Sequence, residues 1–446
     1  MRKSATNFVP PVVQSTTTTT HSGLTRRQVL KSAVAAGVVA YTGSGAIAAD
    51  GITEVTFPWF GWQAPPDSLF WQPFKQEFEQ ENPDIRIDDI PVPYGAFWDK
   101  QFLELSSANS SDIVTMFDSE IKSYINYDFL EPLNPYLEKA GVTLDDFQPG
   151  SRAAVKDGKI FGLPIIVNPR AMLYFSDMLD NVGLHPPTNV TEFYAALQKL
   201  RNKEKQQWGF ATWAKPGAPS SLYLEIAPII FGFGGAFFEA GEPTATKPET
   251  IEALEFYRRI YDEDLIPKGV NFETYRELFA QGRIAMYSAG SYMGPLVRTA
   301  SMERMSHLRS MALPFPGRRT FALSVFMGIG KTAKHKDAAA RVLLGIVSKH
   351  MQSKLLETTA QLPGRQDIDA SGYIAANPWI EAFAAAAGDP HTVSFAPDGA
   401  EVYAPEVIKI IGKNVEAMIF GNSTAKDAAQ TMQKELESLK AVRMPK

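Results

Sequence analysis

The residues best suited to binding chemistry lie in segment 58–63, which reads PWFGWQ and follows a short apolar run. Indole rings can stack on the C–H faces of a sugar, and a side-chain amide can hydrogen-bond to its hydroxyls. We therefore expect Trp59, Trp62 and Gln63 to contact a ligand of this kind. The alternative is that one of the two tryptophans is simply part of the core.

Alternating strand and helix patterns surround this segment. Phe70, Phe74 and Phe78 recur at helical spacing, and Asn82-Pro83 ends that helix. The first part of the chain therefore reads β-α-β-α-β, with strands predicted at 55–60, 85–92 and 113–117. Because strand carboxyl ends and helix N-termini of an open α/β sheet border a crevice, segment 58–63 is placed where ligands bind.

A second alternating series follows. Asn189 is a predicted N-cap with Glu192 three residues later, which places a helix over 189–201. A strand is predicted at 284–287, and core spacing predicts a last helix over 424–440. The fold class is therefore α/β.

The first 48 residues have the features of an export signal. Arg26-Arg27 is followed by an apolar run, 34–48, that is rich in alanine and glycine and ends in the small-x-small pattern Ala46-Ile47-Ala48. We expect a twin-arginine signal peptide, export through the twin-arginine translocase, and cleavage near Ala48. The chain has no cysteine, so disulfides and a lipidated cysteine are excluded. The mature protein is expected to be soluble in the periplasm.

Charge and length narrow the classes of function. Five of the 44 basic residues and none of the 49 acidic residues lie in the signal, so the mature chain carries 39 against 49, a net charge of −10. Such a balance argues against binding of nucleic acid. Nearly 400 mature residues are too many for one core, and two domains are expected.

The sequence contains no complete motif for binding a cofactor or for catalysis. Gly330-Lys331-Thr332 resembles the end of a phosphate-binding loop, but Val325 stands where its first glycine is required. The histidines lack ligand spacing, and no serine lies in a nucleophile elbow. We expect no metal, no cofactor and no catalytic residues.

Five ordered motifs resemble extracellular solute-binding proteins of carbohydrate ABC importers, the group that includes maltose-binding proteins. They are FEQENPDI at 78–85, SDIV at 111–114, GKIFGLP at 158–164, FAQGRIAM with GSY over 279–292, and KHKDAA at 334–339. The resemblance implies a type II periplasmic binding protein fold with two α/β lobes and ligand in the cleft between them. It places 49–163 and 314–368 in lobe 1, and 164–313 and 369–446 in lobe 2.

The same resemblance implies a function and partners. The protein would be a monomeric substrate-binding component that captures a sugar by hinge closure and delivers it to an inner-membrane ABC permease, without acting as an enzyme. A secreted carbohydrate-active enzyme and a periplasmic ligand module of a sensor stay open as alternatives.

Further ligand contacts are implied by position in the family. Asp118 follows the third strand, where the family often places a carboxylate, although it could instead cap the next helix. Arg170 follows the first crossover, where family members more often have a small or polar residue, and is either a ligand contact or a solvated or salt-bridging arginine. An arginine in the cleft would suit either an acidic sugar or the hydroxyls of a neutral one. The remaining candidates are Trp213, Gly235, Ser291, Tyr292 and Arg365.

Overall fold

The computed structural model describes residues 51–63, 65–317, 319–389 and 391–443, and residues 51–446 form one compact unit. The predicted signal peptide lies outside the described residues. Among them, no helix is both long enough and apolar enough to cross a membrane.

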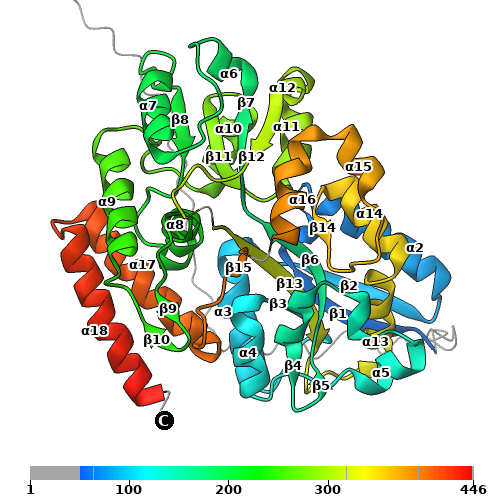
Figure 1. The fold of residues 1–446 in the computed structure, drawn as a ribbon. Coiled ribbons are helices and arrows are strands. Elements are labelled where there is room, and N and C mark those ends of the chain that lie inside the picture. The colour runs from blue at the N-terminus through cyan, green and yellow to red at the C-terminus, as the bar shows by residue number, and fades with distance from the viewer. Residues whose placement is uncertain (1–50, 64, 318, 390, 444–446) are drawn as a thin grey trace, which may run out of the picture. The chain divides into compact units, whose positions relative to one another are not determined.

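The predicted β-α-β-α-β unit is confirmed at the start of the described chain (Figure 1). Strands β1 and β2 pair in parallel, and β3 lies next to β1. Asp112 fixes this arrangement, because its carboxylate accepts hydrogen bonds from the backbone and hydroxyl of Thr56 at 2.9 Å. The elements are β1 (Thr53–Trp59), α2 (Ser68–Glu81), β2 (Ile85–Pro91), α3 (Tyr94–Ser106) and β3 (Ile113–Phe117).

A first sheet of five strands is organised around one long central strand, β13. One edge of β13 pairs antiparallel with β6, while the other edge pairs with β3 and, further along, with β15. The fifth strand, β14, pairs with the outer edge of β6. The strands not yet given are β6 (Leu163–Pro169), β13 (Phe321–Ile329), β14 (Leu362–Pro363) and β15 (Val393–Ser394).

A second sheet has four strands in the order β12-β7-β11-β8. The predicted strand at 284–287 is confirmed as the core of β11, all of whose residues are buried. The strands are β7 (Ala171–Phe175), β8 (Trp208–Ala211), β11 (Ile284–Ala289) and β12 (Leu308–Met311). Short hairpins are formed by β4 (Val155–Lys156) with β5 (Lys159–Ile160), and by β9 (Phe238–Glu239) with β10 (Glu242–Pro243).

The chain passes from the first sheet to the second between β6 and β7, with Arg170 as the single residue between them. It returns through residues 312–320, between β12 and β13. Strand pairing therefore puts the first passage a few residues beyond the predicted boundary at 163–164, because β6 stays hydrogen-bonded to β13 as far as Pro169. The division into two lobes stays a prediction.

Helices cover both sheets, and four of them, α8, α9, α17 and α18, pack against one another (Figure 1). The prediction of the helix after Asn189 is confirmed, since the Asn189 side chain accepts a hydrogen bond from the backbone of Glu192. The remaining helices are α4 (Asp118–Asn126), α5 (Asn134–Ala140), α6 (Ser176–Asp180), α7 (Val190–Leu200), α8 (Pro219–Phe233), α9 (Pro248–Asp262), α10 (Phe272–Ala280), α11 (Met293–Ala300), α12 (Met302–His307), α13 (Lys336–Ile346), α14 (Lys349–Thr359), α15 (Ser371–Ala376), α16 (Glu381–Gly388), α17 (Ala404–Phe420) and α18 (Ala425–Arg443).

Candidate functional site

A group of buried polar side chains lies where Arg170 passes between the two sheets. Arg170 and Glu225 are 3% and 4% exposed, and their Nη2 and Oε1 atoms lie 4.0 Å apart. Arg276 acts electrostatically on both of them. We call these residues, together with three tyrosines, the central polar cluster: Arg170, Glu225, Tyr275, Arg276, Tyr287 and Tyr292.

The members come from several different elements. The backbone N–H of Arg170 donates to the carbonyl of Phe321 at 2.9 Å, and its guanidinium lies 5.7 Å from the centre of the Phe321 ring. Glu225 lies within α8, Tyr275 and Arg276 within α10, Tyr287 within β11, and Tyr292 directly before α11. Six positions spread over more than 120 residues thus meet because the second sheet and its helices bring them together.

Several polar atoms of this cluster have no hydrogen-bond partner among the described residues. They are Nη1 of Arg170, Oε1 of Glu225, Nε of Arg276 and the hydroxyls of Tyr275 and Tyr287, and the nearby hydroxyl of Ser291 shares this state. Tyr292 differs, because its hydroxyl accepts a hydrogen bond from Nη2 of Arg276 at 3.0 Å. Buried polar groups are normally paired, so such a concentration is typical of a binding site.

Burial dominates the electrostatics of Glu225. Loss of solvent raises the pKa of its carboxyl to about 7, against the lowering influence of Arg170 and Arg276. Tyr275 and Tyr287 also lower this pKa, although neither hydroxyl makes a hydrogen bond of good geometry. The same burial raises the pKa of both tyrosines well above their usual range, which keeps them neutral hydroxyl groups.

A chain of polar contacts beside the first sheet ends at Asp67, on which Arg276 of the cluster acts electrostatically. The Asn168 amide donates to Gln361 at 3.2 Å, and Gln361 in turn donates to the Asp67 carboxylate at 2.5 Å. Asp67 precedes α2 and feels the positive charge of Arg276, but loss of solvent raises its pKa to about 6 even though its side chain keeps some exposure. Two arginines and two carboxylates therefore share this region.

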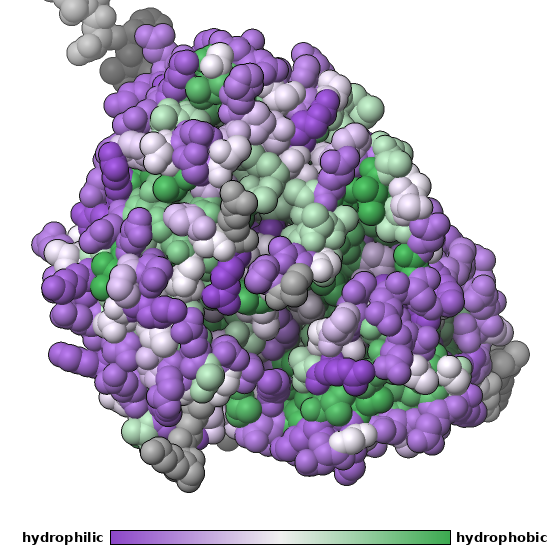
Figure 2. Space-filling view, in the orientation of Figure 1, coloured by the Kyte–Doolittle hydropathy of each residue, from purple (hydrophilic) through white to green (hydrophobic). Residues whose placement is uncertain are grey.

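A cavity of about 250 Å³ lies beside the end of α8 and the β9–β10 hairpin. Its walls include the aromatic rings of Tyr223, Phe231, Phe237 and Phe238 and the charged side chains of Glu239, Arg319, Asp398 and Glu401. Phe321 connects the cavity to the cluster, since its ring packs on Phe231 at 6.1 Å and lies under the guanidinium of Arg170. Figure 2 shows the molecule in the orientation of Figure 1. The surface on this face is mostly hydrophilic and is hollowed near its centre.

The two predicted tryptophans are core residues by burial, each about 1% exposed. Trp62 donates its indole N–H to the carbonyl of Phe57 at 2.8 Å and packs edge-on against Trp71. Trp59 packs on Phe60 at 3.8 Å, and its indole nitrogen has no partner among the described residues. Gln63 is exposed. These contacts favour the core alternative for Trp62, and a ligand role for Trp59, Trp62 and Gln63 stays a prediction.

Glycine at position 61 allows the fold of this loop. A Cβ at Gly61 would lie 2.2 Å from Nε1 of Trp59, so a larger residue would push that indole out of place.

Asp118 is the first residue of α4, and its carboxylate faces the segment that lines the cavity. Its Oδ2 accepts hydrogen bonds from the hydroxyl of Ser394 at 2.8 Å and from the backbone of Phe395 at 3.2 Å, while Oδ1 has no partner among the described residues. Burial raises the pKa of Asp118 to about 7, with Ser394 opposing and Glu120 adding to the rise. The alternative, capping of the following helix by Asp118, is not seen among the described residues, because the hydrogen bonds to its carboxylate come from Ser394 and Phe395, and a ligand role for Asp118 stays a prediction.

The predicted ligand contacts near the second sheet fall into two groups, those beside the central polar cluster and those outside it. Ser291 and Tyr292 adjoin or belong to the central polar cluster. Trp213 is 4% exposed, donates to the carbonyl of Lys215, and packs on Phe272 at 5.0 Å, so its contacts are those of a core residue. Gly235 lies against α9, where an added Cβ would be 2.7 Å from Oγ1 of Thr250. Ligand contacts of these four residues stay predictions.

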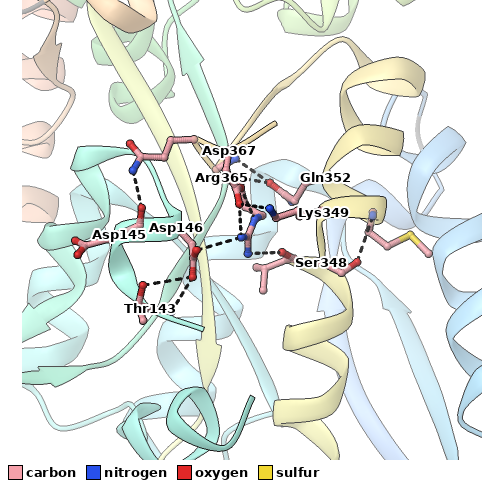
Figure 3. A network of polar contacts seen from close by, with 12 residues as sticks. Thr143, Asp145, Asp146, Ser348, Lys349, Gln352, Arg365 and Asp367 are labelled. Carbon is pink, nitrogen blue, oxygen red and sulfur yellow. Dashed lines mark hydrogen bonds and ion pairs between the residues drawn. The ribbon is translucent and has the colours of Figure 1, made fainter. Parts of the chain in front are cut away.

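Arg365 belongs to a separate network, drawn in Figure 3. Its guanidinium makes two hydrogen bonds to Asp367 at 2.7 and 2.8 Å, an ion pair to Asp146 at 3.4 Å, and a hydrogen bond to the carbonyl of Val347. Arg365 lowers the pKa of Asp367 strongly, and Lys349 adds to this effect. The network ties the 143–146 loop to β14 and α14, and a ligand role for Arg365 stays a prediction.

Four members of the cluster escaped prediction: Glu225, Tyr275, Arg276 and Tyr287. One signal for Glu225 was present, because it is the only charged residue of α8, whose residues from Leu222 to Phe233 are all buried. A charge in a helix that is apolar all round is costly unless it has a purpose. Tyr275 and Arg276 lie on an ordinary amphipathic helix and Tyr287 on a fully buried strand, so these three carried no such signal.

Residues 61–345 match a protein family described as bacterial extracellular solute-binding protein. The chain belongs to this family. A protein of Brucella abortus (strain 2308), named as a binding protein, is 24% identical over 341 residues, which are 75% of this chain and 82% of that protein.

Solved structures show the same fold at low identity. An ABC transporter solute-binding protein of Thermotoga lettingae TMO, bound with alpha-D-tagatose, superposes with a TM-score of 0.77 at 18% identity over 87% of this chain and 99% of that one. Maltose-bound MalE3 of T. maritima gives 0.75 at 20% identity over 86% and 99%. The expected type II periplasmic binding protein fold is thereby confirmed.

Proposed function

We propose that this solute-binding protein captures a carbohydrate outside the cytoplasmic membrane and delivers it to the permease of an ABC importer. The observation that carries the proposal is the central polar cluster, in which hydroxyl, guanidinium and carboxylate atoms are buried without partners among the described residues. Sugars present many hydroxyls and satisfy such donors and acceptors together. Membership of the family and structural likeness to sugar-bound proteins support the same proposal.

Capture proceeds by closure of two lobes. All six cluster residues fall in predicted lobe 2, whereas Asp67 and Gln361, which reach toward them, fall in predicted lobe 1. A ligand that contacts both groups stabilises the closed state relative to the open one. Small-angle scattering with and without saturating sugar tests this step, and an unchanged radius of gyration would count against it.

The protein acts in the periplasm as a soluble monomer after export by the twin-arginine translocase and cleavage near Ala48. The arginine pair and the small-residue run at 46–48 support this part of the proposal. N-terminal sequencing of the protein recovered from the periplasm tests it, and recovery of an uncleaved cytoplasmic chain would contradict it.

A binding protein releases its ligand unchanged. A thermal-shift screen against neutral sugars, polyols, uronates and sugar phosphates identifies the ligand, because tight binding raises the melting temperature by mass action. Incubation with that ligand followed by chromatography separates binding from hydrolysis. Product above a buffer blank would favour a carbohydrate-active enzyme, and absence of any stabilising sugar would refute the proposal.

A further inference from the structure

The contact between Arg170 and Glu225 is unusual for a buried ion pair. The two side chains are almost completely buried, yet Nη2 and Oε1 are 4.0 Å apart, longer than a hydrogen bond. Oε1 of Glu225 and Nη1 of Arg170 have no hydrogen-bond partner among the described residues. Buried charges lose their solvation, and a loose geometry recovers little of that loss. The pair therefore contributes little to stability. Each of its two side chains keeps one polar atom that a ligand can hydrogen-bond.

The chemistry of the two unpartnered atoms defines what fits. A guanidinium nitrogen can only donate, and an ionised carboxylate oxygen can only accept. A hydroxyl group does both, so one hydroxyl can accept from Nη1 while its neighbour donates to Oε1 of Glu225. The hydroxyls of Ser291, Tyr275 and Tyr287, also without partners among the described residues, can serve further hydroxyls of the same molecule.

Charge balance then separates neutral from acidic ligands. Arg170 and Arg276 contribute two positive charges, and Glu225 and Asp67 contribute two negative ones. The charges of this region, two of them buried and two half-buried, therefore already cancel when both carboxyls are ionised. A carboxylate or phosphate placed beside Glu225 would add an uncompensated negative charge in a desolvated site and could not donate to Oε1.

We propose that Arg170 and Glu225 are the specificity-determining pair of this site, that they bind two adjacent hydroxyls of a neutral sugar or polyol, and that they exclude the corresponding uronates and sugar phosphates. The inference rests on the proposed function and narrows its ligand class. The sequence left open whether Arg170 binds an acidic or a neutral sugar. Because Glu225 neutralises the charge of Arg170, a neutral sugar is favoured.

The first experiment measures paired probes by calorimetry and thermal shift at about pH 8, above the pKa of Glu225. Each pair shares every hydroxyl except the one at C6: glucose with glucuronate and glucose 6-phosphate, and galactose with galacturonate. The neutral member of the binding pair is expected to bind at least about 100-fold more tightly than its acidic counterpart. An acidic member that binds as tightly or more tightly overturns the inference and leaves the carbohydrate proposal intact. If neither neutral nor acidic sugars bind, the proposed function fails, and the inference fails with it.

The second experiment changes the pair itself. Glu225→Gln keeps the shape of the side chain and removes its charge, so the ratio of acidic to neutral affinity is expected to rise by roughly 10-fold or more. Arg170→Gln is expected to weaken every probe and leave the ratio low. The ratio is measured within one protein preparation, so it does not depend on how much of the variant folds.

Glu77→Gln is the matched control for the glutamate change. Glu77 lies on α2 and pairs with Lys354 and His350 of α14, outside the cluster. Its replacement is expected to leave both affinities and their ratio unchanged. A ratio in Glu225→Gln that equals the ratio in this control and in the wild type would overturn the role of the pair.

Discussion

Replacing Asp118 by asparagine is expected to flatten the pH dependence of stability. In the folded protein, burial raises the pKa of this carboxyl from 3.8 to about 7. The folded state therefore holds the proton more tightly than the unfolded state does. The stability that the protonated Asp118 contributes is complete below the pKa of this carboxyl in the unfolded chain. It is lost as the pH rises through the pKa in the folded protein.

The size of the effect follows from these two pKa values. Linkage gives a contribution of roughly 3 kcal/mol at about pH 5 and nearly zero at about pH 8. With an unfolding entropy of about 2 cal/mol/K for each residue, a folded unit of roughly 400 residues shifts its melting temperature by about 3 °C. Asparagine keeps an oxygen that accepts from Ser394 and Phe395, so the variant loses the titration and retains these two hydrogen bonds.

The assay is thermal unfolding followed by circular dichroism between about pH 5 and pH 8. The melting temperature of the wild type should fall by about 3 °C relative to that of Asp118→Asn over this range as the pH rises. Asp84→Asn is the control, because Asp84 pairs with Arg341, which lowers its pKa and moves its titration below this window. Parallel curves for wild type and Asp118→Asn would refute the reasoning.

Three further changes separate stability from binding. Arg365→Ala removes a buried guanidinium from its carboxylate partners and should lower the free energy of unfolding by about 3–5 kcal/mol in urea titration. Gly364→Ala would place a Cβ 1.9 Å from the carbonyl oxygen of Pro164, so little folded protein is expected by size-exclusion chromatography. Tyr292→Phe removes the hydroxyl that receives a hydrogen bond from Arg276 and should weaken sugar binding about 5- to 10-fold in calorimetry. A folded Gly364→Ala protein, or a Tyr292→Phe protein with wild-type affinity, would contradict these assignments.

Local patterns predicted the elements that have one buried face or a clear boundary. The strand at 113–117 was predicted to the residue, and the helix after Asn189 begins where its cap indicates. The last helix, predicted over 424–440, is observed as Ala425–Arg443. The helix α8 left no comparable signal, because it is buried on all sides and has no polar face, and Pro228 interrupts its pattern.

The site was harder to predict because its residues meet only through tertiary structure. Ser291 and Tyr292 were found through a motif that resembles the family, and Arg170 through its position after the first crossover. Nothing in the sequence pairs Arg170 with Glu225, since two strands of the second sheet and two helices, β7, α6, α7 and β8, lie between them in the chain. The aromatic loop after β1 leaves a core role and a ligand role open, because indole rings serve a core as well as a binding surface.

A crystal structure of the protein with the sugar that most raises its melting temperature tests the central claim most directly. The account predicts sugar hydroxyls within hydrogen-bond distance of Nη1 of Arg170 and Oε1 of Glu225, the two atoms that have no partner among the described residues. A sugar bound elsewhere, for instance confined to the cavity beside the β9–β10 hairpin with the Arg170–Glu225 pair untouched, would contradict it.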